Sequence, residues 1–158
     1  MEKSELLKKI ILAVEDEIKG LELSAGLSHQ MSVDAPSAMQ SHSDTTKFQM
    51  KALEENTKRS ILEKQIFLRN VVDLISLQKE AKEVEIGSLV RISEGESMKQ
   101  YILLEGGAGI IVEDDGKKWI VVTIASPLGE ALLGKKKGEK FIFFAGGKER
   151  ELEILEVK

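Results

Sequence analysis

Two aspartates in the first half of the chain, Asp34 and Asp44, are the residues best suited to chemistry. They belong to a segment, residues 28–46, that is rich in Ser, Thr and Ala and carries few other charges. Carboxylates are hard oxygen ligands of the kind that Mg²⁺ prefers. The pair therefore suggests that this polar segment is an exposed tip of the molecule, where the two carboxylates contact magnesium. Two structural roles remain open as well: Asp34 starts a turn before Pro36, and Asp44 caps a helix.

Two other patterns each lack something that their chemistry requires. Residues 129–136 have the spacing of a phosphate-binding P-loop, but Lys136 stands where that motif needs Ser or Thr for magnesium. The two histidines, His29 and His42, have no evident third metal ligand, and the chain contains no cysteine. The sequence thus predicts no catalytic residues, no intrinsic metal or other cofactor, and a protein that is not itself an enzyme.

Charge and hydropathy exclude further classes of protein. The 158 residues carry a net charge of −4, and basic residues divide evenly, with 11 in residues 1–80 and 12 in residues 81–158. Neither half is therefore a basic module for nucleic acid. No apolar run approaches the length of a membrane span, and the opening MEKSELLKK lacks the apolar core of a signal peptide. We expect a cytoplasmic protein that makes no membrane contact.

Apolar residues spaced in heptads predict two long helices in the first half of the chain. The first seam contains Leu7, Ile11, Val14, Ile18, Leu21 and Ala25, and the second contains Thr57, Ile61, Lys64, Leu68, Val71 and Ile75. Additional apolar residues suggest that the end of the second helix packs against another surface; these are Leu62, Phe67, Leu74 and Leu77.

The segment between the two seams predicts a reversal of the chain. Pro36 and its polar neighbours indicate a turn near residues 33–43, with Ser43 or Asp44 capping the second helix. Residues 1–80 would then form an antiparallel coiled-coil finger in a monomer. The alternative is a parallel coiled coil made by two chains.

After residue 84 the apolar period changes to two, which is typical of strands. The predicted strands are Leu89–Ile92, Gln100–Leu104, Gly109–Val112, Trp119–Ile124, Phe141–Phe144 and Arg150–Val157. A short helix should begin at Ser126 as N-cap with Pro127 in its first position, and end at Gly134. Gly146 and Gly147 predict a tight turn between the last two strands. Residues 84–158 therefore predict a small α+β domain.

The C-terminal pattern resembles the bacterial Gre transcription elongation factors. The matching residues are Ser126-Pro127-Leu128-Gly129, Ala131 to Lys136, Gly138, Gly147 and Arg150 to Glu156. The resemblance is strong over residues 84–158 and extends to the finger only in architecture. It implies an FKBP-like fold for the C-terminal domain.

The resemblance also implies a function. Gre factors dock their C-terminal domain on RNA polymerase, and their coiled coil enters the secondary channel to modulate elongation or transcript cleavage. The family's docking segment corresponds to Ser126, Pro127 and Leu128, which would expose a small apolar knob. The tip acids would correspond to Asp34 and Asp44, which would share Mg²⁺ with the polymerase. Contact with nucleic acid would then be indirect, through the elongation complex.

The sequence departs from the family at the tip. Cleavage-stimulating Gre factors carry a second acid three residues after the first, whereas here Lys47 follows Asp44 and Ser37 follows Asp34 at that spacing. An ammonium group near the site would oppose a second magnesium ion electrostatically. One alternative is therefore a Gre-like inhibitor that does not stimulate cleavage. Two others, a coiled-coil adaptor and an FKBP-like prolyl isomerase, would have no connection with the polymerase.

Overall fold

The computed structural model describes residues 3–34, 40–77 and 81–158, and the chain divides into two compact units. The helical arm contains Ala13–Ile66. The sheet domain combines Met1–Leu12 with Phe67–Lys158. The sequence-based boundaries at residues 80 and 84 stay a prediction.

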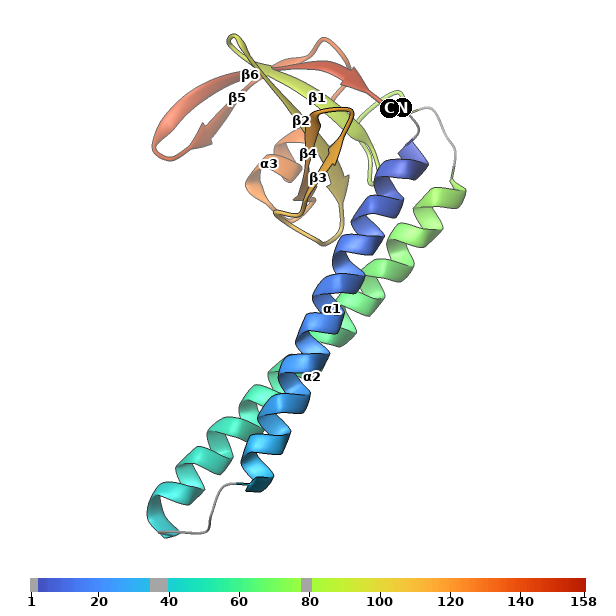
Figure 1. The fold of residues 1–158 in the computed structure, drawn as a ribbon. Helices are drawn as coiled ribbons and strands as arrows, with labels where there is room; N and C mark the ends of the chain where they lie inside the picture. The colour runs from blue at the N-terminus through green and yellow to red at the C-terminus, as the bar shows by residue number, and fades with distance from the viewer. Residues whose placement is uncertain (1–2, 35–39, 78–80) are drawn as a thin grey trace. The chain divides into compact units, whose positions relative to one another are not determined.

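Two long helices form the N-terminal hairpin, α1 (Lys3–Asp34) and α2 (Gln40–Ser76) (Figure 1). Within the arm, Val14 and Ile18 of the first predicted seam are buried. Lys64 of the second seam is half-buried, and its Nζ donates a hydrogen bond to the Glu17 carboxylate of the other helix. A lysine can hold a seam position in this way, because its stem packs while its charge finds a partner. The antiparallel hairpin is confirmed, and the parallel pairing of two chains is not needed.

The centre of the predicted tip, residues 35–39, lies outside the described residues. The helix α2 begins at Gln40, so the prediction that Ser43 or Asp44 caps it is wrong. Both residues lie inside the first turns of the helix. The helix dipole favours an acid in the first turns of a helix even when that acid is not the cap. For this reason the predicted start of the helix lies too far along the chain.

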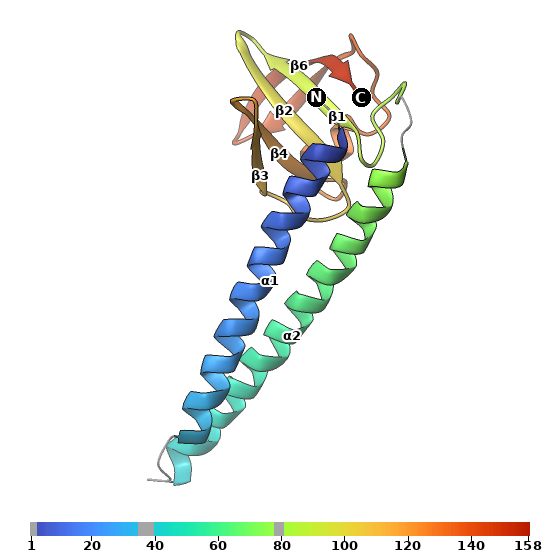
Figure 2. The ribbon, with the colours of Figure 1, turned by 45° about the vertical axis from the view of Figure 1, so that its right-hand side comes forward.

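Six strands form one sheet in the sheet domain (Figure 2). They are β1 (Leu89–Glu94), β2 (Ser97–Leu104), β3 (Ile111–Asp114), β4 (Lys117–Thr123), β5 (Lys140–Ala145) and β6 (Lys148–Val157). Their order across the sheet is β3-β4-β2-β1-β6-β5, with β2 and β4 parallel and every other pair antiparallel. The strands β3 and β5 therefore form the two edges.

One short helix, α3 (Pro127–Leu132), closes the core of the sheet domain. Leu132 of this helix is fully buried among side chains from the central strands. The buried members of this core are Val84, Val90, Ile92, Leu103, Val122, Leu132, Leu152 and Ile154. The predicted α+β fold, a helical hairpin followed by a small sheet domain, is confirmed.

The base of the hairpin belongs to the sheet domain. Leu6, Leu7 and Ile10 of α1 are fully buried there. Lys9 Nζ lies 2.5 Å from a carboxylate oxygen of Asp114, the last residue of β3, and 2.9 Å from the Glu113 carbonyl oxygen. No helix in the described ranges has the apolar stretch that crossing a bilayer requires.

Phe67 and Leu74 account for the extra apolar residues at the end of α2. A Cβ atom at Gly107 would lie 2.7 Å from the Phe67 ring, and one at Gly87 would lie 3.0 Å from a Leu74 methyl group. The prediction that this end packs against another surface is therefore confirmed for these two residues. It is wrong for Leu62 and Leu77, which are exposed.

Candidate functional site

The segment Ser126–Leu128 begins α3 at the end of β4. Ser126 Oγ accepts a hydrogen bond from the Gly129 N–H at 3.1 Å and donates one to the Thr123 carbonyl oxygen at 2.7 Å. This double contact makes Ser126 the N-cap and ties the helix to the strand. Pro127 occupies the first turn, where its missing N–H costs nothing, and its side chain is exposed.

Gly129 holds α3 against the strand that precedes it. A Cβ atom at this position would lie 1.9 Å from the Thr123 carbonyl oxygen, so no other residue fits without movement of the backbone. The sequence placed Gly129 in a P-loop-like spacing and in the motif that resembles the Gre factors, but neither pattern predicted this role. The signal was present, because a glycine inside a helix is costly unless close approach of the backbone requires it. Residues 129–132 are helical, which removes the P-loop alternative.

Leu128 has a different environment from Pro127. Its side chain is half-buried and packs against the core of the sheet domain. The apolar surface that α3 offers to a partner therefore comes from Pro127 and from Leu133, which is half exposed just after the helix. Leu128 sets the position of this surface from beneath.

The hollow beside Leu128 is almost filled by protein side chains. Tyr101 and Phe143 line it together with Leu128, and its volume is about 40 Å³. Burial raises the pKa of the Tyr101 phenol above its ordinary value. Sites for organic ligands usually measure about 300–1,000 Å³, so this hollow offers no room for a prolyl ring with its flanking peptide.

An ion-pair cluster closes one side of the same hollow. A Glu94 carboxylate oxygen lies 2.7 Å from Lys99 Nζ, and the other lies 3.1 Å from an Arg150 guanidinium nitrogen. The hydrogen bond from Lys99 is the main reason why the pKa of Glu94 is lowered. The single Glu94 carboxylate thus binds both cations of the cluster.

The two tip aspartates lie in helical backbone. Asp34 is the last residue of α1, and Asp44 lies within the first turns of α2; their side chains fall outside the described part of the structure. Lys47 is described and exposed, whereas Ser37 lies outside the described residues. His29 is exposed on α1, and the described residues contain no group of three or more potential metal ligands. Whether the tip contacts Mg²⁺ stays a prediction.

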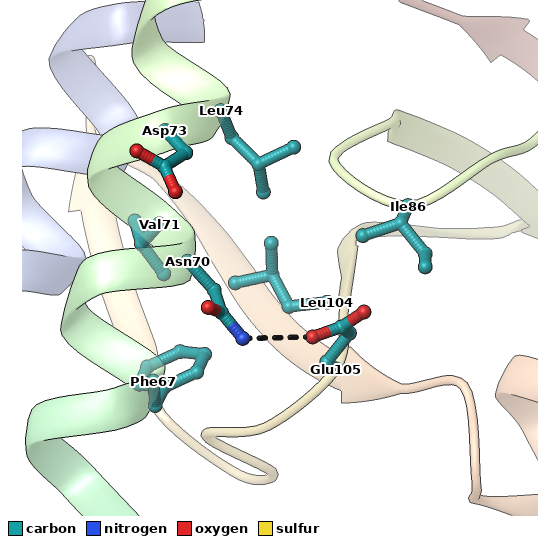
Figure 3. Close-up of a pocket in the computed structure, with 8 residues that line it drawn as sticks. All are labelled: Phe67, Asn70, Val71, Asp73, Leu74, Ile86, Leu104 and Glu105. Carbon is teal, nitrogen blue, oxygen red and sulfur yellow. Dashed lines mark hydrogen bonds between the residues drawn. The ribbon is translucent and has the colours of Figure 1, made fainter.

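A second hollow of about 210 Å³ lies within the sheet domain, between the base of α2 and the loops beside β1 and β2 (Figure 3). Asn70 Nδ2 donates a hydrogen bond to the Glu105 carboxylate at 2.8 Å across its floor. Phe67, Leu74 and Leu104 supply apolar walls. Its one close polar pair is satisfied internally, so the hollow is better explained as a packing gap at the base of the hairpin than as a reactive site.

Comparisons with known proteins agree with the C-terminal pattern. Residues 78–158 match the family model described as "Transcription elongation factor, GreA/GreB, C-term". A search of curated protein sequences gave no match.

Several solved structures are similar to the chain at low identity. GreA factor homolog 1 (Gfh1) of Thermus thermophilus is 18% identical, with 96% of this chain and 94% of that chain covered and a TM-score of 0.38. Gfh1 of Thermus aquaticus is 15% identical over 95% and 92%, with a TM-score of 0.39. A GreA/GreB elongation factor from Nitrosomonas europaea is 22% identical over 56% and 78%, with a TM-score of 0.39.

At these TM-scores the structural matches carry no argument, and the assignment depends on the family model. That model covers residues 78–158, just over half of the 158-residue chain. The protein therefore belongs to the GreA/GreB family of transcription elongation factors.

Proposed function

We propose that the chain binds RNA polymerase through the segment Ser126–Leu128 of its sheet domain and extends its helical arm into the secondary channel. Membership of the GreA/GreB family is the observation that carries this proposal. The geometry supports it, because Ser126 and Gly129 fix α3 against β4 while Pro127 stays exposed. An apolar contact held in place before binding loses little conformational entropy when a partner arrives.

In this proposal the chain is not itself a catalyst. Hydrolysis of the transcript belongs to the polymerase, and the arm changes its rate by what its tip brings to the active site. The tip offers Asp34 and Asp44 but has Lys47 at the position of the expected second acid. A positive charge there opposes a second Mg²⁺ ion, so the chain occupies the channel and stimulates cleavage weakly or not at all.

The prolyl isomerase alternative has less support. The hollow between Tyr101, Leu128 and Phe143 has a volume of only about 40 Å³. Substrate binding there would require displacement of side chains that pack against the domain core. A direct measurement of polymerase binding distinguishes our proposal from the remaining alternative, a coiled-coil adaptor that does not bind polymerase.

A transcript-cleavage assay tests the proposal. The purified chain is added to stalled, backtracked RNA polymerase complexes with Mg²⁺, and the length of the RNA 3′ end is followed. We expect little shortening by this chain and inhibition of an active Gre factor added to the same reaction. Rapid shortening that is lost in Asp44→Ala or Asp34→Ala would instead identify a working cleavage factor.

A binding assay tests the docking segment separately. Pro127→Ala should weaken binding to core polymerase several-fold, because it removes exposed apolar surface without touching the core. Met98→Ala is the matched control, since Met98 is also an exposed apolar residue of the sheet domain but lies at the start of β2, outside the apolar surface of α3. Unchanged affinity for Pro127→Ala, with an intact thermal transition, would contradict docking through this segment.

A further inference from the structure

The edge strand β5 exposes large apolar side chains beside an unpaired backbone. It is the last strand in the sheet order and pairs only with β6. Ile142 and Phe144 are 61% and 67% exposed, while Phe141 and Phe143 alternate with them and pack against the core. Natural sheets usually protect their edges with charges, prolines or bulges, because an open apolar edge invites another strand. In β5 only Lys140, its first residue, carries a charge, and the strand contains no proline.

The hairpin geometry determines which backbone groups of β5 are free. Gly146 and Gly147 have φ values of 61° and 74°, as a two-residue type I′ turn requires, and Ala145 pairs with Lys148 across it. Hydrogen-bonded and non-hydrogen-bonded pairs alternate along an antiparallel ladder, starting from the bonded pair beside such a turn. Ile142 and Phe144 therefore direct their N–H and C=O groups away from β6. The exposed apolar side chains and the free backbone groups belong to the same residues.

The neighbouring strand adds negative charge to the same face. Residues directly opposite in a ladder share a face, and Phe144 and Ile142 lie opposite Glu149 and Glu151. Both glutamates are exposed, and neither forms an ion pair within the described residues. Glu149 and Glu151 also line an open hollow of about 550 Å³ between β6 and the end of β1, and the two cations that line it, Lys140 and Arg150, form ion pairs with Glu153 and Glu94. This face of the hairpin therefore combines two apolar side chains with two unpaired carboxylates.

We propose that β5 accepts an extended segment of RNA polymerase as an added strand, and that this segment carries apolar side chains together with Lys or Arg. Main-chain hydrogen bonds to Ile142 and Phe144 would supply affinity, and the side chains would supply specificity. Adjacent strands are about 4.8 Å apart, so an extended arginine on the added strand can reach the carboxylates of β6. The inference rests on the proposed function and adds a second contact to that of α3.

The charge on this face favours a basic partner over a second copy of the chain. If two β5 edges paired, Ile142 and Phe144 of both copies would meet, but the glutamate rows of both copies would share one face. Like charges brought together at an interface disfavour the complex, whereas opposite charges speed association and select the partner. Self-association through β5 is thus the competing outcome, and the experiments below distinguish it from binding to polymerase.

Ile142→Pro is the sharpest test of strand addition. Proline is tolerated in an edge strand where its missing N–H would face solvent, so the ladder to β6 should survive. Ile142→Thr is the matched control, because it reduces apolar surface at the same position but keeps the outward N–H. We expect Ile142→Pro to weaken binding to core polymerase by roughly tenfold relative to Ile142→Thr, as loss of main-chain hydrogen bonding implies. Thermal unfolding of both variants verifies that they fold.

A second variant and a direct readout complete the test. Glu149→Gln combined with Glu151→Gln should lower the affinity and flatten its dependence on salt. In hydrogen exchange of the wild-type chain, the amides of Ile142 and Phe144 should become protected when polymerase is added. Equal affinity of folded Ile142→Pro and Ile142→Thr would overturn the proposal, as would protection that depends on chain concentration without polymerase. A wild-type chain that does not bind polymerase would instead overturn the proposed function itself.

Discussion

At the residue scale, Gly129 is the glycine with the closest contact to neighbouring backbone, and it adjoins the proposed docking segment. Gly129→Ala would place a methyl group 1.9 Å from the Thr123 carbonyl oxygen. The helix α3 would have to move away from β4, and we expect a loss of about 2 kcal/mol in the free energy of unfolding. Urea denaturation followed by circular dichroism measures this loss.

Gly20→Ala in α1 serves as the control for that substitution. A Cβ atom at Gly20 meets nothing within 4 Å, and alanine is the better helix former by about 1 kcal/mol. Gly20→Ala should therefore stabilise the arm, whereas Gly129→Ala should destabilise the sheet domain. Equal, small effects of both substitutions would contradict the role assigned to Gly129.

Lys47 carries the second prediction at this scale. Lys47→Glu would place an acid three residues after Asp44, and residues at this spacing lie on one face of a helix. If the lysine is what opposes the second magnesium ion, this variant should raise the rate of transcript shortening in backtracked complexes by at least tenfold. Lys51→Glu makes the same change of charge one turn further from the tip, and it should have no such effect. A rate for Lys47→Glu no higher than that for Lys51→Glu would locate the defect elsewhere in the tip.

At the element scale, the sequence predicted the helices and strands well because their apolar periods are strong. The two seams, all six strands, the Ser126 cap and the tight Gly146-Gly147 turn have their counterparts in the structure. The least accurate strand is β3, expected at Gly109–Val112 and found at Ile111–Asp114. Gly109 has a φ of +82°, which belongs to a turn, and no sequence period reveals that.

What the sequence could not predict depends on contacts between distant residues. The exposed face of β5 follows from its place at the end of the sheet, which alternation along one strand does not reveal. The half-burial of Leu128 follows from the approach of α3 to the core. For the candidate site, motif similarity pointed to Ser126, Pro127 and Leu128, but only the structure separates the exposed Pro127 from the supporting Leu128.

The ion-pair cluster at the β1–β2 hairpin gives a prediction about pH at this scale. Lys99 and Arg150 hold the pKa of Glu94 below its ordinary value of 4.5. Because the folded pKa is the lower one, the stabilisation is fully present above 4.5 and is lost as the pH falls through the folded value. Glu94→Gln should therefore lower the melting temperature at pH 7 and have a smaller effect at pH 3. Glu96→Gln, in the turn of the same hairpin, is the control, and an equal effect of Glu94→Gln at both pH values would contradict this assignment.

At the scale of the whole molecule, the proposed function places docking in the sheet domain and the effect on transcript cleavage in the helical arm. The sheet domain includes the base of each hairpin helix. The residues of α1 and α2 that are buried there are Leu6, Leu7, Ile10, Phe67 and Val71. A variant in which a short polar turn joins Leu12 to Phe67, replacing Ala13–Ile66, should therefore fold. A fragment of residues 84–158 should be markedly less stable, because it lacks these apolar side chains.

The full chain and the variant without the arm together test whether docking and the effect on transcript cleavage belong to different parts of the chain. The variant without the arm keeps Ser126–Leu128 and β5, so we expect it to compete with the full chain for core polymerase. It should no longer inhibit an active Gre factor by filling the channel, although at high concentration it can still displace one from a shared docking surface. RNA 3′-end length followed without an added Gre factor distinguishes these effects, because only an arm inside the channel can change the rate at which the polymerase itself shortens the transcript. Loss of polymerase binding together with the arm, in a variant that still unfolds cooperatively, would show that the arm itself provides the main contact and would refute docking through α3.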